Sequence, residues 1–304
     1  MFVVCGEALF DVFATGETPS GLAMDARIGG SPFNVAVGLA RLGQPVAFLS
    51  QVSRGFLGER LMRALAAEGV DTRTVQRSDA PTTLSLIGVD GRGVPAYSFY
   101  GEGCADRLLD AAALDTLPPG VKAIHFGSYA TVVGRTAETQ RLLVERAQGR
   151  ALVAYDPNIR LNVEPRLEVW REHIEWMLPR TQLLKVSDED LGLVWPGLAP
   201  DEFAARALGR GVKLVVVTRG GEGALGWTAS AHVAAAPVKV SVVDTVGAGD
   251  TFQAALLTWL AEHDALGDSA LPTDALAEAL AFAARAAAIT CSRRGADMPR
   301  RAEV

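Results

Sequence analysis

The stretch that decides the fold is Asp244-Thr245-Val246-Gly247-Ala248-Gly249-Asp250-Thr251-Phe252. It lies between an apolar run at 238–243, which predicts a strand, and a second apolar run at 253–262, which predicts a helix. Gly247 and Gly249 lack Cβ atoms, so the backbone can turn tightly there and present successive N–H groups to a ligand. These N–H groups also carry the positive end of the helix dipole. The junction is therefore predicted to bind an anion.

Asp250 is unexpected in such a cradle, because its charge opposes a bound phosphate. A carboxylate is useful there if it acts as a base toward a hydroxyl that attacks the phosphate. We therefore predict that Asp250 is the catalytic base and that the backbone of Gly247, Ala248 and Gly249 forms the anion hole. The alternative from the residues alone is an ordinary glycine-rich turn with an aspartate in the first turn of a helix.

The segment DTVGAGDTFQAALL at 244–257 resembles the C-terminal signature of the ribokinase-like (PfkB) carbohydrate kinases. The other half of that family's pattern is present in the expected order, as GGSPFNVA at 29–36 running on to Gly43. The resemblance covers essentially the whole chain, and it is greatest to fructokinases. It implies an α/β fold, a ribokinase-like three-layer sandwich with a central mostly parallel sheet and a small β-sheet lid. It also implies one kinase domain over residues 1–304.

Composition is consistent with this fold. The chain has 304 residues, of which 49% are hydrophobic, so a large buried core is expected. A net charge of −6 argues against a nucleic-acid or anionic-membrane binder. The apolar run at 1–6 has no basic flank or cleavage site, so it predicts a strand and not a signal peptide. Cys5, Cys104 and Cys291 match no metal spacing and are interpreted as reduced thiols of a cytoplasmic protein.

Apolar strands alternate with helices along most of the chain, which is typical of a parallel sheet covered on both faces. The expected strands lie at 2–6, 46–52, 70–77, 121–127, 151–156, 181–187 and 213–218. The expected helices lie at 31–43, 56–68, near 136–148 and 165–177, from 188 onward, and at 273–291. Ligands in such folds bind at the carboxyl ends of the strands.

A second, smaller sheet is expected from the segments 9–28 and 82–101, where apolar and polar residues alternate around a hairpin turn at 90–93. In the family such a sheet is a lid over the sugar and is often used for dimerisation, so the resemblance implies a homodimer through the lid. A lid would exclude water, which competes with the sugar as phosphoryl acceptor.

The sugar site is expected where the lid meets the first motif. The resemblance implies that Asp11 grips two sugar hydroxyls, since carboxylate oxygens accept hydrogen bonds from neighbouring O–H groups. It also implies that Gly30 and Asn34 touch the sugar. From the residues alone, Ser31 is predicted to cap the helix at 31–43, and Pro32 is predicted to be its first helical residue.

Two further residues complete the predicted sugar site. Phe99 is predicted to form an apolar wall, although fructokinase-like sequences tend to read Phe-Tyr-Arg where this chain has Gly101 after Phe99-Tyr100. The missing guanidinium leaves the identity of the sugar open. Arg160, in a DPNIR stretch that resembles fructokinases and 2-keto-3-deoxygluconate kinases, is predicted to clamp sugar hydroxyls or the migrating phosphoryl group.

The nucleotide site is predicted from two later stretches. Thr218, Gly220 and Gly223 resemble the family's T-x-G-x-x-G nucleotide loop, and Lys185 and Ser187 are predicted contacts of the nucleotide.

Two residues are predicted to act on cations. The family usually has Asn-x-x-Glu where this chain has Ser187 and Asp190, so Asp190 is expected to act on Mg²⁺ through water. Asp244, with the turn at 292–296, resembles a monovalent-cation site for K⁺.

The resemblance therefore implies a kinase that uses ATP and Mg²⁺ to phosphorylate a ketohexose, with fructose as the first expectation and 2-keto-3-deoxygluconate or another sugar as alternatives. Two alternatives come from other classes. Gly221, Gly223 and Gly226 spell the G-x-G-x-x-G of dinucleotide-dependent oxidoreductases, although the residues that follow do not predict a helix. A non-catalytic sugar-binding protein would need Asp11 and Asn34 but not Asp250.

Overall fold

The main sheet of the protein has nine strands in the order β13-β12-β11-β10-β9-β8-β1-β4-β5, in a computed structural model that describes residues 1–89, 95–267 and 271–304. Neighbouring strands from β5 to β11 are parallel, while β12 and β13 each run antiparallel to the preceding strand. The strands are β1 Phe2–Cys5, β4 Val46–Ser53, β5 Val75–Ser78, β8 Ala123–Gly127, β9 Leu152–Asp156, β10 Leu183–Ser187, β11 Leu214–Thr218, β12 Ala224–Trp227 and β13 His232–Ala235. The predicted mostly parallel sheet is confirmed, and the strand expected at 70–77 is shortened to β5.

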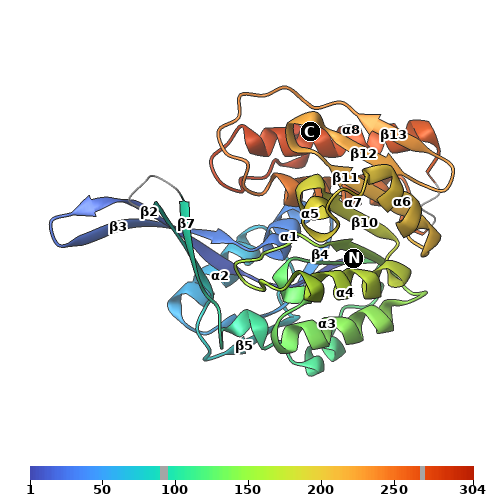
Figure 1. The fold of residues 1–304 in the computed structure, drawn as a ribbon. Helices are drawn as coiled ribbons and strands as arrows, with labels where there is room; N and C mark the ends of the chain where they lie inside the picture. Colours follow the sequence, from blue (N-terminus) through green and yellow to red (C-terminus); the bar gives the residue numbers. More distant parts are fainter. Residues whose placement is uncertain (90–94, 268–270) are drawn as a thin grey trace.

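Helices cover both faces of this sheet, because alternate strand residues enter two separate cores. Phe2 and Val4 belong to one core, and Val3 and Cys5 belong to the other. The first core is covered by α1 Ser31–Arg41, α2 Phe56–Ala67, α7 Ala248–Glu262 and α8 Thr273–Cys291. The second is covered by α3 Gly134–Ala147, α4 Leu167–Met177, α5 Asp188–Val194 and α6 Pro200–Gly209. Figure 1 shows α8 on one side of the strands and α3 and α4 on the other, so the predicted three-layer sandwich is confirmed.

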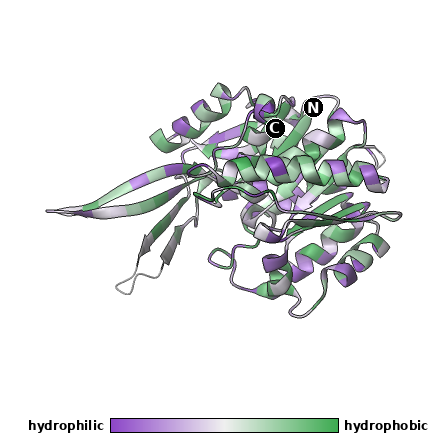
Figure 2. Ribbon diagram, turned by 90° about the horizontal axis from the view of Figure 1, so that it is seen from above, coloured by the Kyte–Doolittle hydropathy of each residue, from purple (hydrophilic) through white to green (hydrophobic). Residues whose placement is uncertain are grey.

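The second sheet has four strands in the order β3-β2-β6-β7. Its strands are β2 Leu9–Thr18, β3 Gly21–Gly29, β6 Leu84–Val89 and β7 Pro95–Tyr100. Leu9 and Phe10 are buried in the body, whereas Leu22 and Met24 near the far end are 58% and 51% exposed. The β2–β3 hairpin accordingly projects from the body in both views (Figures 1 and 2). The turn predicted at 90–93 lies outside the described residues.

The predicted strand at 238–243 is wrong, because this segment has no strand pairing and most of it is exposed. Pro237 follows β13 and cannot donate an N–H to a ladder. The backbone N–H groups of Val243 and Asp244 both donate to the carbonyl oxygen of Cys291, at 2.8 and 3.2 Å. The chain therefore leaves the sheet after β13 and returns along the end of α8 before α7 begins.

No helix within the described ranges is long and apolar enough to cross a bilayer.

Candidate active site

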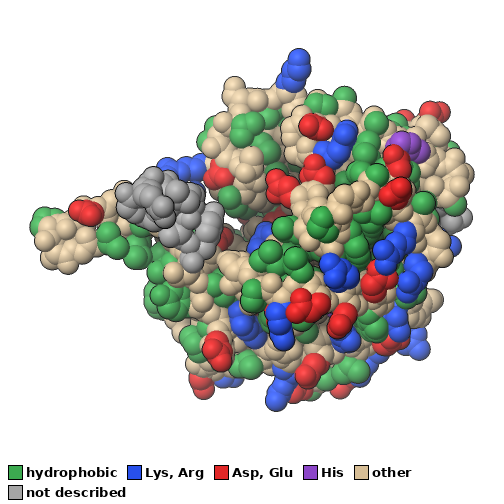
Figure 3. Space-filling model, in the orientation of Figure 1, with side chains coloured by type: hydrophobic (Ala, Val, Ile, Leu, Met, Phe, Trp, Pro, Cys, Tyr) green, Lys and Arg blue, Asp and Glu red, His purple; other side chains and the backbone are tan. Residues whose placement is uncertain are grey.

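A cavity of about 1320 Å³ lies at the carboxyl ends of the parallel strands, beside the small sheet. Among its lining residues are the predicted sugar-side residues Asp11, Gly30, Asn34, Phe99 and Arg160. Also among them are the predicted nucleotide and phosphate residues Lys185, Ser187, Asp190, Thr218, Gly220, Gly223, Gly247, Ala248, Gly249 and Asp250. Figure 3 shows a recess in the surface of the body on the side that lies toward the projecting hairpin. Residues from both halves of the chain therefore share one cavity.

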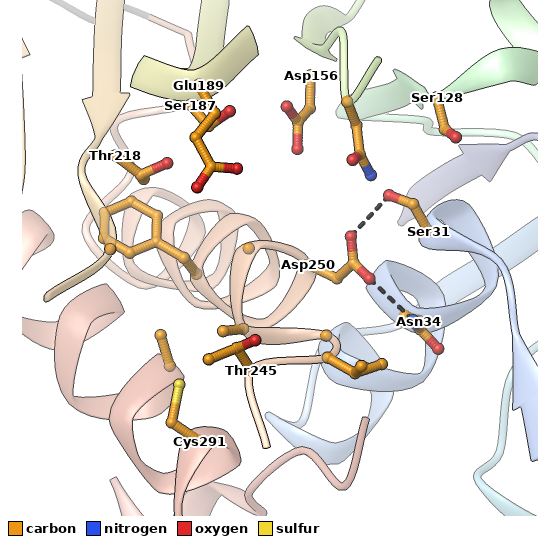
Figure 4. Close-up of a pocket in the computed structure, with 18 of the residues that line it drawn as sticks. Ser31, Asn34, Ser128, Asp156, Ser187, Glu189, Thr218, Thr245, Asp250 and Cys291 are labelled. Atoms are coloured by element: carbon orange, nitrogen blue, oxygen red, sulfur yellow. Dashed lines mark hydrogen bonds between the residues drawn. The ribbon is translucent and has the colours of Figure 1, made fainter. Parts of the chain in front are cut away.

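Asp250 lies where the N-terminal ends of α1 and α7 meet (Figure 4). Its Oδ1 accepts a hydrogen bond from the Ser31 hydroxyl at 2.6 Å, and its Oδ2 accepts one from the Asn34 amide at 2.8 Å. Burial raises the pKa of the Asp250 carboxyl, while the bonds from Ser31 and Asn34 and the nearby charge of Lys185 oppose that rise. The carboxylate is thus held in one orientation and is a stronger base than an exposed aspartate.

The capping role predicted for Ser31 is wrong, because Gly30 is the N-cap of α1 and the Ser31 side chain makes no capping bond. Pro32 is accordingly the second helical residue and not the first. Gly30 adopts φ 104°, and a Cβ there would lie 2.8 Å from the carbonyl oxygen of Glu7. Only glycine fits this close approach without displacing the backbone, and the Ser31 hydroxyl is left for Asp250.

The start of α7 is shaped by Gly247, which is its N-cap in the left-handed conformation at φ 78°. A Cβ on Gly247 would lie 2.5 Å from the Cβ of Ala296, so the turn is packed against the C-terminal segment. The N–H groups of Gly249 and Asp250 belong to the first helical turn, where helix geometry supplies no partner. This arrangement is suited to an anion, as the sequence predicts.

A buried ion pair lies beside this helix start. Lys185 Nζ on β10 donates to Asp156 Oδ2 on β9 at 2.5 Å, and both side chains are less than 5% exposed. A Cβ on Gly249 would lie 3.4 Å from Lys185 Nζ, so the ammonium group faces the helix start. Asp156 has no role in the sequence analysis, although a carboxylate at the end of an apolar strand in this fold is a signal for a ligand site.

Acidic side chains of α5 lie at the cavity wall. Burial, followed by the charge of Asp156, raises the pKa of Asp190 to about 6. Its Oδ1 accepts the Ile159 N–H at 3.3 Å, while the Ser187 hydroxyl caps α5 by accepting the Asp190 N–H at 3.0 Å. Glu189 also lines the cavity, and Figure 4 shows it beside Ser187 and Thr218.

The described residues contain no group of three or more side chains that could hold a metal by themselves. Mg²⁺ is commonly bound by one or two carboxylates together with substrate phosphates and water. Asp190 and Glu189 at the cavity wall fit that kind of site.

The predicted nucleotide loop follows β11 and includes a short 3₁₀ helix at Gly220–Glu222. A Cβ on Gly223 would lie 3.0 Å from the nitrogen of Pro237, so this glycine lets the loop approach the segment after β13. Val238, Val240 and Val242 of that segment line the cavity.

After this loop the chain continues as β12 and β13, which pair antiparallel. No helix follows Gly226, which removes the context that the dinucleotide fingerprint requires. The oxidoreductase alternative therefore lacks its structural basis.

At the end of the cavity beside the small sheet, Phe99 packs edge-on against Tyr129, with ring centroids 5.4 Å apart, and both line the cavity. The guanidinium of Arg107 lies over these two rings, 5.3 and 5.6 Å from their centroids. A Cβ on Gly101 would lie 2.5 Å from Arg107 Nη2. Arg107 therefore fills the space beside the residue where fructokinase-like sequences tend to carry arginine, and sequence reasoning missed it.

Asp244 lies outside the cavity wall. Its Oδ1 accepts the Val246 N–H at 3.1 Å, and its Oδ2 accepts the Gly295 N–H at 2.9 Å. The carboxylate thus ties the turn before α7 to the turn after α8.

The fold and the site together define a sugar phosphotransferase, in which a helix start suited to phosphate, a buried carboxylate and a polar pocket share one cavity. Residues 1–302 match the model of the pfkB family carbohydrate kinases, and the chain belongs to that family. The family predicted from the two motifs is confirmed, and the protein is an ATP-dependent carbohydrate kinase.

Several proteins that are similar to this chain are named fructokinase. A fructokinase of Rhizobium leguminosarum bv. trifolii is 37% identical over 86% of this chain and 79% of its own length. Fructokinase-2 of Solanum lycopersicum is 32% identical over 97% of this chain and 92% of its own. Among solved structures, a fructokinase of Xylella fastidiosa with bound ATP has a TM-score of 0.87 and 29% identity, covering 99% of this chain and 96% of that one.

Proposed function

We propose that the protein is a fructokinase that transfers the γ-phosphoryl group of ATP to a hydroxyl of fructose. The observation that carries the proposal is the single cavity in which Asp250 lies between the sugar-side residues and the phosphate-side helix start. Relatives named fructokinase, one of them 37% identical to this chain, support fructose as the sugar.

Proton transfer is assigned to Asp250. A free sugar hydroxyl is too weakly acidic to ionise beforehand, so its proton moves to Asp250 as the oxygen attacks the γ-phosphorus and the bond to the leaving ADP breaks. Ser31 and Asn34 hold the carboxylate toward the acceptor. Asp11, Gly30, Asn34, Phe99 and Arg160 are the proposed sugar contacts.

Charge stabilisation is assigned to the backbone N–H groups of 247–250 and to the ammonium group of Lys185. Within this turn the Ala248 N–H donates to the Thr245 carbonyl oxygen at 3.2 Å, so Gly249 and Asp250 supply the main donors. These donors are fixed before the reaction, and removing one such group typically lowers the rate by ~10² to 10³. Arg160 is a further cation at the cavity wall that can reach sugar hydroxyls or the migrating phosphoryl group.

ATP is proposed to bind along Thr218, Gly220 and Gly223, with Lys185 and Ser187 near its phosphates. The fructokinase of Xylella fastidiosa, which binds ATP in its solved structure, supports this use of the fold. Asp190 and Glu189 would hold Mg²⁺, Asp190 through water, and the ion would supply charge neutralisation of the phosphate oxygens. Asp244 is proposed to contribute to a K⁺ site.

The chain is proposed to form one kinase domain over 1–304, with the segments 9–28 and 82–101 as its lid. Leu22 and Met24, exposed on the projecting hairpin, support a homodimer through this lid. The three cysteines are unpaired thiols, which supports a cytoplasmic enzyme. The net charge of −6 disfavours nucleic acid or anionic membranes as partners.

Side-by-side kinetics with fructose, 2-keto-3-deoxygluconate, tagatose and ribose test the proposal. We expect the highest kcat/KM for fructose. A higher kcat/KM for 2-keto-3-deoxygluconate would replace fructose by an acidic sugar. Arg160 at the cavity wall and Arg107 over Phe99 would then be the candidate cations for its carboxylate. Sugar binding without ATP consumption would indicate a non-catalytic binding protein, and an absorbance change with NADH would indicate an oxidoreductase.

A further inference from the structure

Glu7 is a buried acid at the sugar end of the cavity, and the mechanism above does not use it. It follows β1, a central strand of the main sheet, and it lines the cavity although only 1% of the residue is exposed. Its carbonyl oxygen lies against Gly30, the residue before Ser31. The Glu7 backbone is therefore fixed relative to the helix that holds Asp250 and the proposed sugar contact Asn34.

One carboxyl oxygen of Glu7 is left unsatisfied. Oε2 is buried and has no hydrogen-bond partner among the described residues. A buried polar atom without a partner is costly, and such atoms in native proteins are commonly satisfied by water or by a ligand. Because Glu7 lines the cavity, we take a molecule bound there as the partner of this carboxyl group.

The surroundings of Glu7 favour its neutral form. Four titratable groups face the Glu7 carboxyl group: Cys5 of β1, Asp106 of the 3₁₀ helix Ala105–Arg107, Tyr129 of the 3₁₀ helix Tyr129–Thr131, and Arg160 after β9. Two further carboxyl groups, Asp11 of β2 and Asp250 of α7, line the same cavity. Burial raises the pKa of the Glu7 carboxyl to about 8, Asp106 adds to the rise, and Ser128 and Arg160 oppose it. At pH 7 the carboxyl group therefore keeps its proton and offers an O–H donor.

We propose that Glu7 is a sugar-binding residue whose neutral carboxyl group donates a hydrogen bond from its O–H to an oxygen of the bound sugar. The inference rests on the proposed function of the cavity and adds a donor to it. Asp11 and Asp250 are acceptors when ionised, so they recognise sugar hydroxyls that donate. A neutral Glu7 would instead recognise a sugar oxygen that accepts a hydrogen bond, which neither ionised carboxylate can do.

Two variants separate this role from a merely structural one. Glu7→Gln keeps the shape and a hydrogen-bond donor but cannot ionise, whereas Glu7→Leu removes every polar atom of the side chain. We expect Glu7→Leu to raise the KM for fructose by about 10- to 100-fold, with the KM for ATP close to that of the wild type. Glu7→Gln should change the KM for fructose by less than about threefold.

The pH profile gives a readout that does not depend on the folding of Glu7→Leu. The proton of Glu7 is lost as pH rises through about 8, so kcat/KM for fructose in the wild type should fall above that pH. In Glu7→Gln this alkaline decrease should disappear or move to higher pH. The ATP dissociation constant and the thermal midpoint of both variants serve as checks on folding.

Several outcomes would overturn the inference: a folded Glu7→Leu with an unaltered KM for fructose, a Glu7→Gln as impaired as Glu7→Leu, or the same alkaline decrease in Glu7→Gln as in the wild type. These outcomes are distinct from a failure of the proposed function. Absence of fructose phosphorylation by the wild-type enzyme would count against the fructokinase assignment, and the same variants would then be measured with the sugar that the wild type does phosphorylate.

Discussion

Ser31 donates its hydroxyl to Asp250 at 2.6 Å, although 219 residues separate them in the chain. The bond joins the first residue of α1 to the first turn of α7, so the two sequence motifs meet at one carboxylate. Two helix N-termini therefore converge on Asp250, where we propose that a sugar hydroxyl and a phosphoryl group react. Because of this convergence, the site is complete only when both sequence motifs are present.

Replacing Asp250 by Asn or Ala should remove the base and leave the nucleotide site intact. We expect kcat to fall by ~10² to 10⁴, the range typical of a lost general base. ATP affinity should stay close to the wild-type value, because the proposed nucleotide contacts lie on β10 and on the loop after β11. Coupled-assay kinetics and calorimetric ATP titration measure the two effects, and turnover near the wild-type rate in either variant would remove Asp250 from this role.

Ser31→Ala should weaken catalysis through the orientation and pKa of Asp250. Hydrogen bonds to charged groups contribute ~1.5 to 3 kcal/mol, so we expect kcat/KM to fall about 10- to 100-fold. The Ser31 hydroxyl lowers the pKa of Asp250, and its removal should raise that pKa. Since the base must be ionised, the acidic limb of the kcat/KM profile should move to higher pH.

Ser31→Thr is the matched control for this experiment, because it keeps a hydroxyl at the same position. It should retain the wild-type acidic limb more closely than Ser31→Ala does. An acidic limb that stays in place in Ser31→Ala would show that another group controls ionisation.

Much of the architecture is predictable from local patterns. The helix at 273–291 has its observed bounds because its alanines and leucines favour helix throughout and Pro272 marks its start. The same reasoning gives a wrong prediction for 238–243, because the alternating valines of this segment line a cavity and do not enter a sheet. A strand needs a neighbouring edge to pair with, and sequence periodicity does not report whether one is available.

A residue of the candidate site is predictable from sequence where its type suggests a single role within its motif. The positions of Gly247 and Asp250 are of this kind, since Gly247 is the N-cap of α7 and Asp250 lies in its first turn at the cavity wall. Ser31 has two uses, as a cap and as a donor to a distant side chain, and local sequence favours the wrong one. Arg107 is missed because it acts through packing on Phe99, which depends on tertiary structure alone.

The ion pair between Lys185 and Asp156 is expected to affect both stability and catalysis, and a single and a double variant together separate the two effects. Lys185→Met leaves Asp156 as a buried, unpaired carboxylate, and breaking a buried pair in this way typically costs ~3 to 5 kcal/mol. We therefore expect a lower thermal midpoint together with a decrease in kcat of ~10² to 10³ from the lost cation.

The double variant Lys185→Met with Asp156→Asn tests which loss matters for catalysis. It removes both charges, so the thermal midpoint should recover part of the loss while kcat stays low. Recovery of kcat with the thermal midpoint would mean that Lys185 serves only to neutralise Asp156.

The metal site can be tested by titrating Mg²⁺ into variants of α5. Asp190→Asn keeps an oxygen that can accept the Ile159 N–H, so the fold should be preserved while the negative charge is removed. If Asp190 acts on Mg²⁺ through water, the Mg²⁺ concentration for half-maximal rate at fixed ATP should rise by about 10- to 100-fold, as for other outer ligands. Glu189→Gln is the matched comparison, since Glu189 lines the same cavity. A larger effect in Glu189→Gln would assign the ion to Glu189, and an unchanged Mg²⁺ requirement in both variants would mean that neither side chain holds it.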